Sequence, residues 1–159
     1  MRARRLLAST GMTDRPGQLD GGHPHLRLVR NRLRVLVAED DAEMRRMVIQ
    51  ALRLDGYHVI EAEDGEELLS LLLANDSTQR DAIDLIVSDV RMPGISGVDM
   101  LETLRAADDT TPVILMTAFP DDLMRRRADN LHAMLFDKPF ELSDLRVAVA
   151  ALLHSRVGT

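Results

Sequence analysis

The 159-residue sequence contains no cysteine, and only 3% of its residues are aromatic. Without cysteine the chain can form neither a disulfide framework nor a thiolate metal site, and it has no thiol nucleophile. All of its apolar runs are much shorter than the roughly 18 residues that a membrane-spanning helix needs. We therefore expect a soluble, cytoplasmic protein that makes no contact with a membrane.

Glycine-rich nucleotide-binding motifs are also absent. The sequence contains neither G-x-x-x-x-G-K-[ST] nor G-x-G-x-x-G, so it has no cradle of this kind for a nucleotide phosphate. Its five histidines lack metal-ligand spacing, apart from His23 and His25 in the N-terminal segment. These absences argue against a nucleotide-binding enzyme and against a histidine-ligated metal centre.

Charge is distributed unevenly along the chain. Residues 1–32 carry seven arginines and two aspartates, a net charge of +5, whereas residues 33–159 carry 13 basic and 24 acidic residues, a net charge of −11. An acidic body argues against a surface for duplex DNA, which needs clustered Lys and Arg. The N-terminal segment could still contact nucleic acid or an acidic partner. Because it has no amphipathic period and contains Gly21-Gly22, Pro16 and Pro24, we predict a flexible basic extension over residues 1–32.

From residue 33 onward, short apolar runs alternate with segments of helical periodicity. The first predicted helix follows Asp41, which can cap its start, and ends before Gly56, where a left-handed residue is favoured. The predicted strands are 33–38, 57–62, 83–87, 112–116 and 133–136, and the other helices are 66–75, 98–107, 121–130 and 141–153. This alternation predicts one α/β domain with a parallel sheet over residues 33–155, followed by a short tail at 156–159.

Polar side chains stand at the carboxyl ends of the predicted strands, where open parallel sheets bind ligands. Glu61 and Glu63 at the second strand are interpreted as solvated loop residues. If the strand order is 2-1-3-4-5, the first and third strands are neighbours and their acids share one pocket. The candidate site residues are Glu39 and Asp40 at the end of the first strand, Asp89 at the end of the third, Thr117 at the end of the fourth and Lys138 after the fifth.

Three carboxylates in one pocket repel one another, by about 3 kcal/mol for each pair at about 5 Å and an effective dielectric constant of about 20. A divalent cation removes this repulsion, and Mg²⁺ takes one or two carboxylates, waters and a phosphate oxygen. A lysine and a hydroxyl nearby could hold the other phosphate oxygens, and a carboxylate could attack a phosphoryl donor. Taken singly, each residue has a simpler explanation as a cap, a turn residue or a surface lysine. Their coincidence at one sheet edge favours the phosphate-plus-Mg²⁺ hypothesis.

Four segments of the sequence resemble motifs of the two-component response-regulator receiver family. They are VLVAEDD (35–41), VSDVRMPGISG (87–97), PVILMTA (112–118) and DKPF (137–140), in the family's order and spacing. The resemblance covers about residues 33–155. It implies a flavodoxin-like, doubly wound sheet of five parallel strands in the order 2-1-3-4-5 with five helices, similar to the chemotaxis receivers.

The resemblance also implies a role for each site residue. Asp89 matches the aspartate that accepts a phosphoryl group from a sensor histidine kinase or a histidine phosphotransfer protein. Asp40 and Asp89 match direct Mg²⁺ ligands, Glu39 matches a ligand acting largely through water, and the carbonyl of Arg91 matches the backbone ligand. Thr117 and Lys138 match the groups that bind the phosphoryl oxygens, Thr117 moving as the switch. The Lys138-Pro139 bond matches one that is usually cis.

Some positions depart from the family's commonest pattern. Glu39 replaces a more frequent Asp, and Leu135 stands where an aromatic switch residue is usual. Phe136 is next along, but successive residues of a strand point to opposite faces, so it should not substitute for that aromatic residue. Arg91 and Phe119 are expected to flank the path of a hydrolytic water, and a bulky Phe119 could lengthen the life of the phosphoryl group.

We therefore expect a single-domain response regulator that is not an enzyme in the ordinary sense and that presents a switched surface at about 121–153 to a downstream protein. Direct DNA binding is not expected. The alternatives are a phosphotransfer intermediate or phosphate sink, and a degenerate receiver used only for docking, against which the intact acidic pair, aspartate, threonine and lysine argue. A phosphatase of the haloacid dehalogenase type would need D-x-D after the first strand, where this sequence has Glu39-Asp40-Asp41.

Overall fold

The computed structural model describes residues 32–75 and 82–157, and ten elements alternate along them. The predicted N-terminal extension lies outside the described residues, except for Arg32. The strands are β1 (Arg34–Ala38), β2 (His58–Ala62), β3 (Leu85–Asp89), β4 (Val113–Thr117) and β5 (Met134–Asp137). The helices are α1 (Ala42–Leu54), α2 (Gly65–Ala74), α3 (Gly97–Ala106), α4 (Asp122–Asn130) and α5 (Leu142–Val157).

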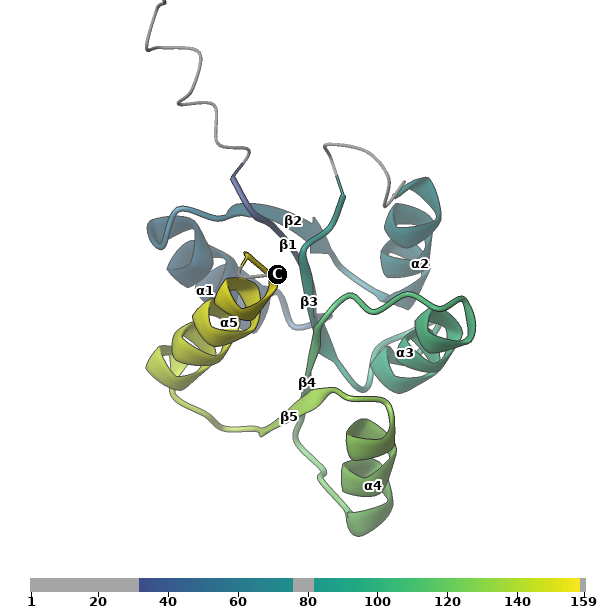
Figure 1. Ribbon diagram of the computed structural model, residues 1–159. Coiled ribbons are helices and arrows are strands. Elements are labelled where there is room, and N and C mark those ends of the chain that lie inside the picture. Colours follow the sequence, from purple (N-terminus) through teal and green to yellow (C-terminus); the bar gives the residue numbers. More distant parts are fainter. Residues whose placement is uncertain (1–31, 76–81, 158–159) are drawn as a thin grey trace, which may run out of the picture. The chain divides into compact units, whose positions relative to one another are not determined.

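All five strands are parallel and form one sheet in the order β2-β1-β3-β4-β5 (Figure 1). The predicted fold, with five helices and this strand order, is therefore confirmed. Val37 of β1 lies beside Glu61 on one side and Val87 on the other, so β1 and β3 are neighbours. Their carboxyl ends meet at one edge of the sheet, which brings the residues after β1 close to the end of β3.

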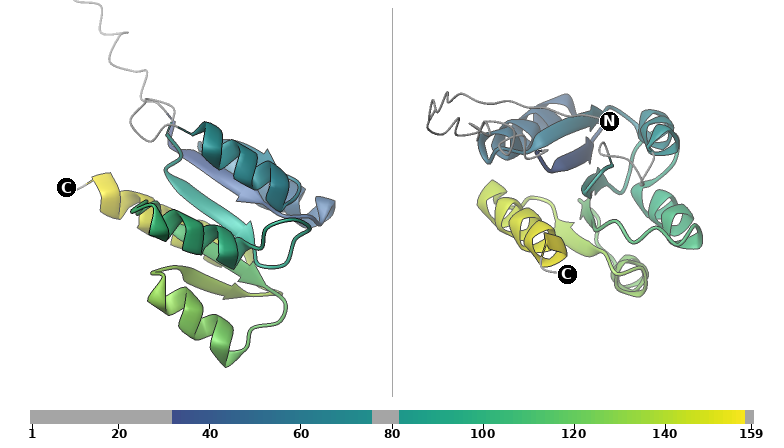
Figure 2. Two further views of the ribbon diagram at one scale, coloured as in Figure 1. Left: turned by 90° about the vertical axis from the view of Figure 1, so that its right-hand side faces the viewer. Right: turned by 45° about the horizontal axis from the view of Figure 1, so that its top comes forward.

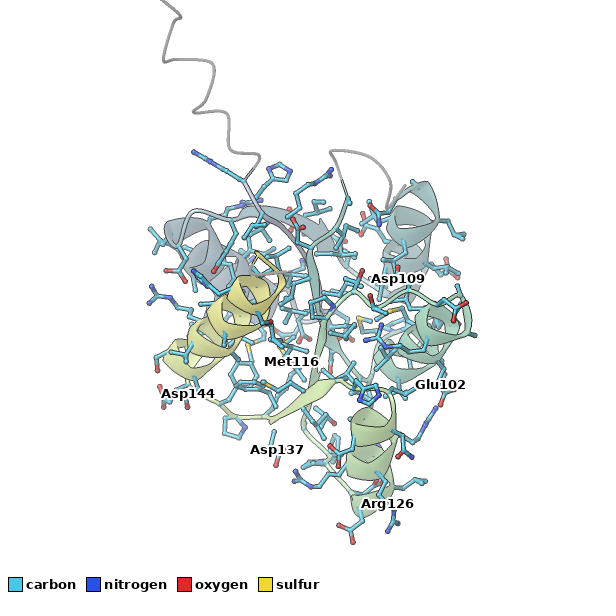
Figure 3. All side chains as sticks on the ribbon, in the orientation of Figure 1. Glu102, Asp109, Met116, Arg126, Asp137 and Asp144 are labelled. Atoms are coloured by element: carbon cyan, nitrogen blue, oxygen red, sulfur yellow. The ribbon has the colours of Figure 1, made fainter. Side chains whose placement is uncertain are left out.

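Helices cover both faces of the sheet, α1 and α5 on one face and α2, α3 and α4 on the other (Figures 1 and 2). Alternate residues of β1 serve the two faces: Val35 and Val37 pack with α1 and α5, and Leu36 packs with α2 to α4. This double coverage explains why the strands are continuous apolar runs. Figure 3 shows the side chains that fill both layers, Met116 among them.

Local signals start and end several elements as the sequence predicts. The Asp41 carboxylate caps α1 by accepting the backbone N–H of Met44 at 2.8 Å, and Gly56 after α1 has a φ of +91°. Similar caps at Asp64, Ser96 and Asp121 start α2, α3 and α4. Each cap satisfies a helical N–H that has no intrahelical partner.

Several element boundaries differ from the predicted ranges. Asp89 closes β3 and Thr117 closes β4, at the strand ends where the sequence predicted them. Both strands extend past the predicted ranges 83–87 and 112–116, because parallel pairing continues to Asp89 beside Met116 and to Thr117 beside Asp137. Glu61 is exposed, as its interpretation as a solvated residue predicted, but it lies within β2 and not in a loop. Helix α5 continues to Val157, past its predicted end at 153 and into the predicted tail, because nothing between them breaks a helix. Among the described residues, no helix is both long and apolar enough to span a bilayer.

Candidate functional site

The structure gathers the three predicted acids at the carboxyl ends of β1 and β3. Carboxylate oxygens of Glu39, Asp40 and Asp89 all lie within 4.8 Å of one another. Glu39 and Asp89 are buried, with 1% and 7% of their surface exposed, whereas Asp40 is exposed. Two buried carboxylates beside a third make this edge strongly electronegative, and the cluster opens to solvent on the Asp40 side.

The main chain at Asp89 is fixed by hydrogen bonds and by close packing against α3. The hydroxyl of Ser88 donates to the Asp89 carbonyl at 3.0 Å, and the next residue, Val90, donates its N–H to Met116 of β4 at 2.8 Å. Gly97 begins α3 so close to Asp89 that a Cβ there would lie 2.4 Å from the Asp89 carbonyl oxygen. Only glycine permits this approach, which packs the start of α3 against the end of β3.

Lys138 reaches the cluster from the far side of β4. Its Nζ lies 2.7 Å from Glu39 Oε2 and 3.4 Å from Asp89 Oδ2. The Lys138 N–H donates to the Thr117 carbonyl at 2.7 Å, and the Lys138-Pro139 bond is cis, as the resemblance implies. Lys138 therefore neutralises part of the acidic charge, and its shorter contact is with Glu39 rather than Asp89, a pairing that the sequence pattern did not predict.

Burial and charge shift the proton affinity of this pair. Burial raises the pKa of Glu39 to about 7, the negative charge of Asp89 adds to the rise, and the hydrogen bond from Lys138 opposes it. Burial alone would lower the pKa of Lys138, but the hydrogen bond to Glu39 and the charges of Asp89 and Glu39 outweigh it and raise that pKa. In the metal-free protein, Glu39 is thus poised to exchange a proton near neutral pH, while Lys138 stays charged.

The donor set fits a hard divalent cation. Three carboxylates face one ammonium group, so negative charge remains in excess at the cluster. Their oxygens are the ligands that Mg²⁺ and Ca²⁺ take, and the exposed Asp40 side leaves room for the waters that Mg²⁺ keeps. The backbone N–H of Arg91 donates to Asp89 Oδ1 at 3.4 Å, so Arg91 lies near this site. The role of the Arg91 carbonyl as a metal ligand stays a prediction.

Thr117 closes β4 beside the cluster and is buried. Its Oγ1 accepts the backbone N–H of Phe119 at 3.1 Å. A hydroxyl that accepts one hydrogen bond can still donate its own hydrogen to another oxygen. Thr117 is therefore linked mechanically to Phe119, two residues along the β4–α4 loop.

Arg91 and Phe119 stack on each other where the β3–α3 and β4–α4 loops meet. The Arg91 guanidinium carbon lies 4.6 Å from the centre of the Phe119 ring, a cation–π contact. Phe119 is 62% exposed, which is unusual for so large an apolar side chain. The stack joins the loop that follows Asp89 to the loop that follows Thr117. Sequence spacing placed both residues near the site, but not in contact.

Leu135 and Phe136 of β5 face opposite sides of the sheet, in agreement with the sequence interpretation. Leu135 packs with the α2–α4 layer, whereas Phe136 packs with the α1–α5 layer and meets Phe140 edge to face at 5.4 Å. Phe136 therefore does not stand in for an aromatic side chain at position 135.

Arg45 on α1 is a further residue at this edge, and the sequence pattern alone did not identify it. Its side chain is buried, and its guanidinium donates to the Glu39 carbonyl at 2.9 Å. The helical spacing could have identified it, because Arg45 precedes the buried Val48, Ile49 and Leu52 by three, four and seven residues and so lies on the same face of α1. An arginine on the buried stripe of a helix needs polar partners inside the protein.

The fold and the acidic edge place the chain in the class of flavodoxin-like, doubly wound α/β proteins. The family model for the response regulator receiver domain matches residues 35–150. The chain therefore belongs to the response regulator receiver domain family, as the four motifs indicated.

Similar proteins agree with this assignment. The chain is 36% identical over 122 residues to the transcriptional regulatory protein CpxR of Escherichia coli K12, covering 76% of this chain and 49% of CpxR. It is 35% identical over 125 residues to the response regulator MprA of Mycolicibacterium vanbaalenii, covering 77% of this chain and 51% of MprA. The chain thus spans about half the length of these curated relatives.

Solved structures with the same fold are also receiver domains. The Francisella response regulator 1452 receiver domain superposes with a TM-score of 0.70 at 28% identity, over 78% of this chain and 98% of that chain. The response regulator TrrA of Thermotoga maritima, solved in complex with Mg²⁺-BeF, superposes with a TM-score of 0.63 at 31% identity, over 76% of this chain and 99% of that one.

Proposed function

We propose that this receiver accepts a phosphoryl group on Asp89 from a phosphohistidine of a sensor histidine kinase or a histidine phosphotransfer protein. The observation that carries the proposal is the cluster of Glu39, Asp40 and Asp89, with Lys138 in reach of two of them, at the carboxyl edge of a receiver-family sheet. The same proposal places the protein in the cytoplasm, without a membrane contact of its own.

The proposed transfer uses a carboxylate as nucleophile. One Asp89 oxygen bonds to phosphorus while the bond from phosphorus to the histidine nitrogen breaks, and that nitrogen takes the electron pair and then a proton. Lys138, which stays charged at neutral pH and whose Nζ lies 3.4 Å from Asp89 Oδ2, would bind an oxygen of the transferred group. Thr117 can donate its hydroxyl hydrogen to another.

Mg²⁺ is the proposed cofactor, held by Asp40 and Asp89 directly, by Glu39 largely through water and by the Arg91 carbonyl. When bound, it would neutralise the negative charge that the phosphoryl group brings to an already acidic pocket. The TrrA complex with Mg²⁺-BeF supports this choice of metal for a protein of the same fold.

The proposed output is a protein-interaction surface on α4, β5 and most of α5, about residues 121–153. A phosphoryl group adds nearly two negative charges, toward which Lys138 and Thr117 can move. Movement of Thr117 would pull on Phe119, because the Phe119 N–H is bonded to the Thr117 hydroxyl. With Leu135 in place of an aromatic residue, this loop is the route by which the site can reach α4.

Phosphorylation of the full chain with acetyl phosphate tests the proposal. We expect Mg²⁺-dependent gain of one phosphoryl group by intact-mass analysis in the wild type and none in Asp89→Asn. The matched control is Asp137→Asn, which removes a carboxylate at the end of neighbouring β5 that pairs with Arg125 instead. It should be phosphorylated like the wild type. Equal labelling of Asp89→Asn and the wild type, or no labelling of either, would reject Asp89 as the acceptor.

The output is tested by affinity capture from cell extract. Phosphorylated wild type and Asp89→Ala should retain different proteins, and substitutions on the exposed face of α4, such as Leu123→Ala, should remove the difference. Identical partner sets for wild type and Asp89→Ala would contradict the switch.

A further inference from the structure

Arg45 is the arginine of α1 that lies buried beside the acidic edge. Its Nη1 donates to the main-chain carbonyl of Glu39 at 2.9 Å, and its Nη2 lies 3.2 Å from Glu63 Oε1. Its Nε lies 3.5 Å from Glu61 Oε2. One guanidinium therefore links the end of β1 to Glu61 near the end of β2 and to Glu63 in the loop after it.

These contacts determine where the peptide between Glu39 and Asp40 lies. The Glu39 N–H donates to the Ala62 carbonyl of β2 at 3.2 Å, and the Glu39 carbonyl accepts from Arg45, so both main-chain polar groups of Glu39 are held. The Glu39 side chain is held as well, by the Asp41 N–H at 3.2 Å and by Lys138.

Asp40 depends on this peptide more than the other two acids do. Glu39 and Asp89 are buried and are positioned by the packing around them, whereas Asp40 is exposed. With little packing around its side chain, Asp40 is placed mainly by its backbone. Arg45 holds the carbonyl on the peptide bond that leads into Asp40.

We propose that Arg45 is a positioning residue for Mg²⁺: it presents Asp40 to the metal by holding the Glu39–Asp40 peptide. The inference rests on the proposed function, because it assumes that the three-carboxylate cluster binds Mg²⁺. Glu63 accepts a hydrogen bond from Nη2 and Glu61 lies within ion-pair distance of Nε, so both carboxylates compensate the arginine charge.

The sign of the effect separates positioning from simple electrostatics. Arg45 is a positive charge close to a cation site, so its loss would tighten Mg²⁺ binding if charge alone mattered. If Arg45 positions Asp40, its loss weakens binding instead. Residues that orient metal ligands typically change metal affinity by about 10- to 100-fold when they are removed.

The test is a titration of the ¹⁵N-labelled full chain with MgCl₂ at constant ionic strength, followed by the backbone amide resonances of Asp40, Asp41 and Val90. We expect Arg45→Ala to weaken Mg²⁺ binding by about tenfold or more. Hydrogen exchange of the Asp41 amide should also accelerate, because its acceptor Glu39 is less well held. The matched control is Arg46→Ala, the exposed neighbour on α1, which removes the same charge and should keep the wild-type affinity.

Arg45→Lys provides a second variant in case Arg45→Ala does not fold. Lysine keeps the charge but cannot reach the Glu39 carbonyl and both glutamates at once, so its Mg²⁺ affinity should also fall below that of the wild type. Wild-type or tighter binding by a folded Arg45→Ala, or wild-type binding by Arg45→Lys, would overturn the inference. A wild type that binds no Mg²⁺ would instead refute the proposed function.

Discussion

The stack of Arg91 on Phe119 should lengthen the life of a phosphoryl group on Asp89. The two side chains join the loops that follow Asp89 and Thr117, and their guanidinium–ring distance of 4.6 Å is that of a cation–π contact. A hydrolytic water needs a path to phosphorus opposite the Asp89 oxygen, and we expect the stack to flank that path. The free energy needed to open the stack then adds to the activation free energy of hydrolysis.

The size of the effect follows from the exposure of the stack. Because Phe119 is 62% exposed, the cation–π contact falls in the range for exposed pairs, about 0.5–1 kcal/mol. If hydrolysis requires the stack to open, Phe119→Ala should accelerate autodephosphorylation about two- to fivefold. Phe119→Leu keeps much of the bulk without a ring face, so the difference between the two variants separates steric blocking from the cation–π contact.

The assay follows the decay of phosphorylated protein after the small-molecule donor is removed, by intact mass at constant Mg²⁺. Leu123→Ala is the matched control, since Leu123 is 61% exposed on α4 and lies outside the stack. It should decay like the wild type. No acceleration in Phe119→Ala, or equal acceleration in Leu123→Ala, would refute the reasoning. A long life would also favour a switch over a phosphate sink.

Two further predictions concern stability. Folding raises the pKa of Glu39 from 4.5 to about 7, so the folded protein binds this proton more tightly than the unfolded chain and loses stability as pH rises across that window. Without Mg²⁺, Glu39→Gln should flatten the pH dependence of thermal unfolding there, and an unchanged slope would contradict the assignment. In the core, Leu115→Ala should lower the free energy of unfolding in urea by about 2–5 kcal/mol, because Leu115 is fully buried. A loss no larger than that of Leu123→Ala would count against this packing.

Much of the fold could be predicted because its signals are local. The apolar runs that become buried parallel strands, the cap at Asp41 and the left-handed Gly56 are all readable from a few adjacent residues. The ends of β3 and β4 were less predictable. Whether Asp89 is the last residue of a strand or the first of a loop depends on its pairing with Met116, which is a tertiary contact.

The candidate site could be predicted in its members but not in its contacts. The three acids could be predicted to lie together because they stand at the ends of strands that are neighbours in the assumed strand order. Their roles were implied by the family resemblance. The 2.7 Å contact between Lys138 and Glu39 joins residues 99 apart in the sequence. It depends on how far a lysine that follows β5 reaches across the ends of β4 and β3, which no local pattern encodes. The Arg45 contacts are missed for the same reason, although its place on a buried helical stripe was a signal.

Chemical trapping of the acyl phosphate tests the central claim most directly. Borohydride reduces an aspartyl phosphate to homoserine, so reduction of the protein after phosphorylation in Mg²⁺, followed by peptide mass spectrometry, marks the acceptor. The account predicts homoserine at position 89 and nowhere else, and none when Mg²⁺ is withheld. Homoserine at position 40 or at any other aspartate, or none after phosphorylation in Mg²⁺, would contradict it.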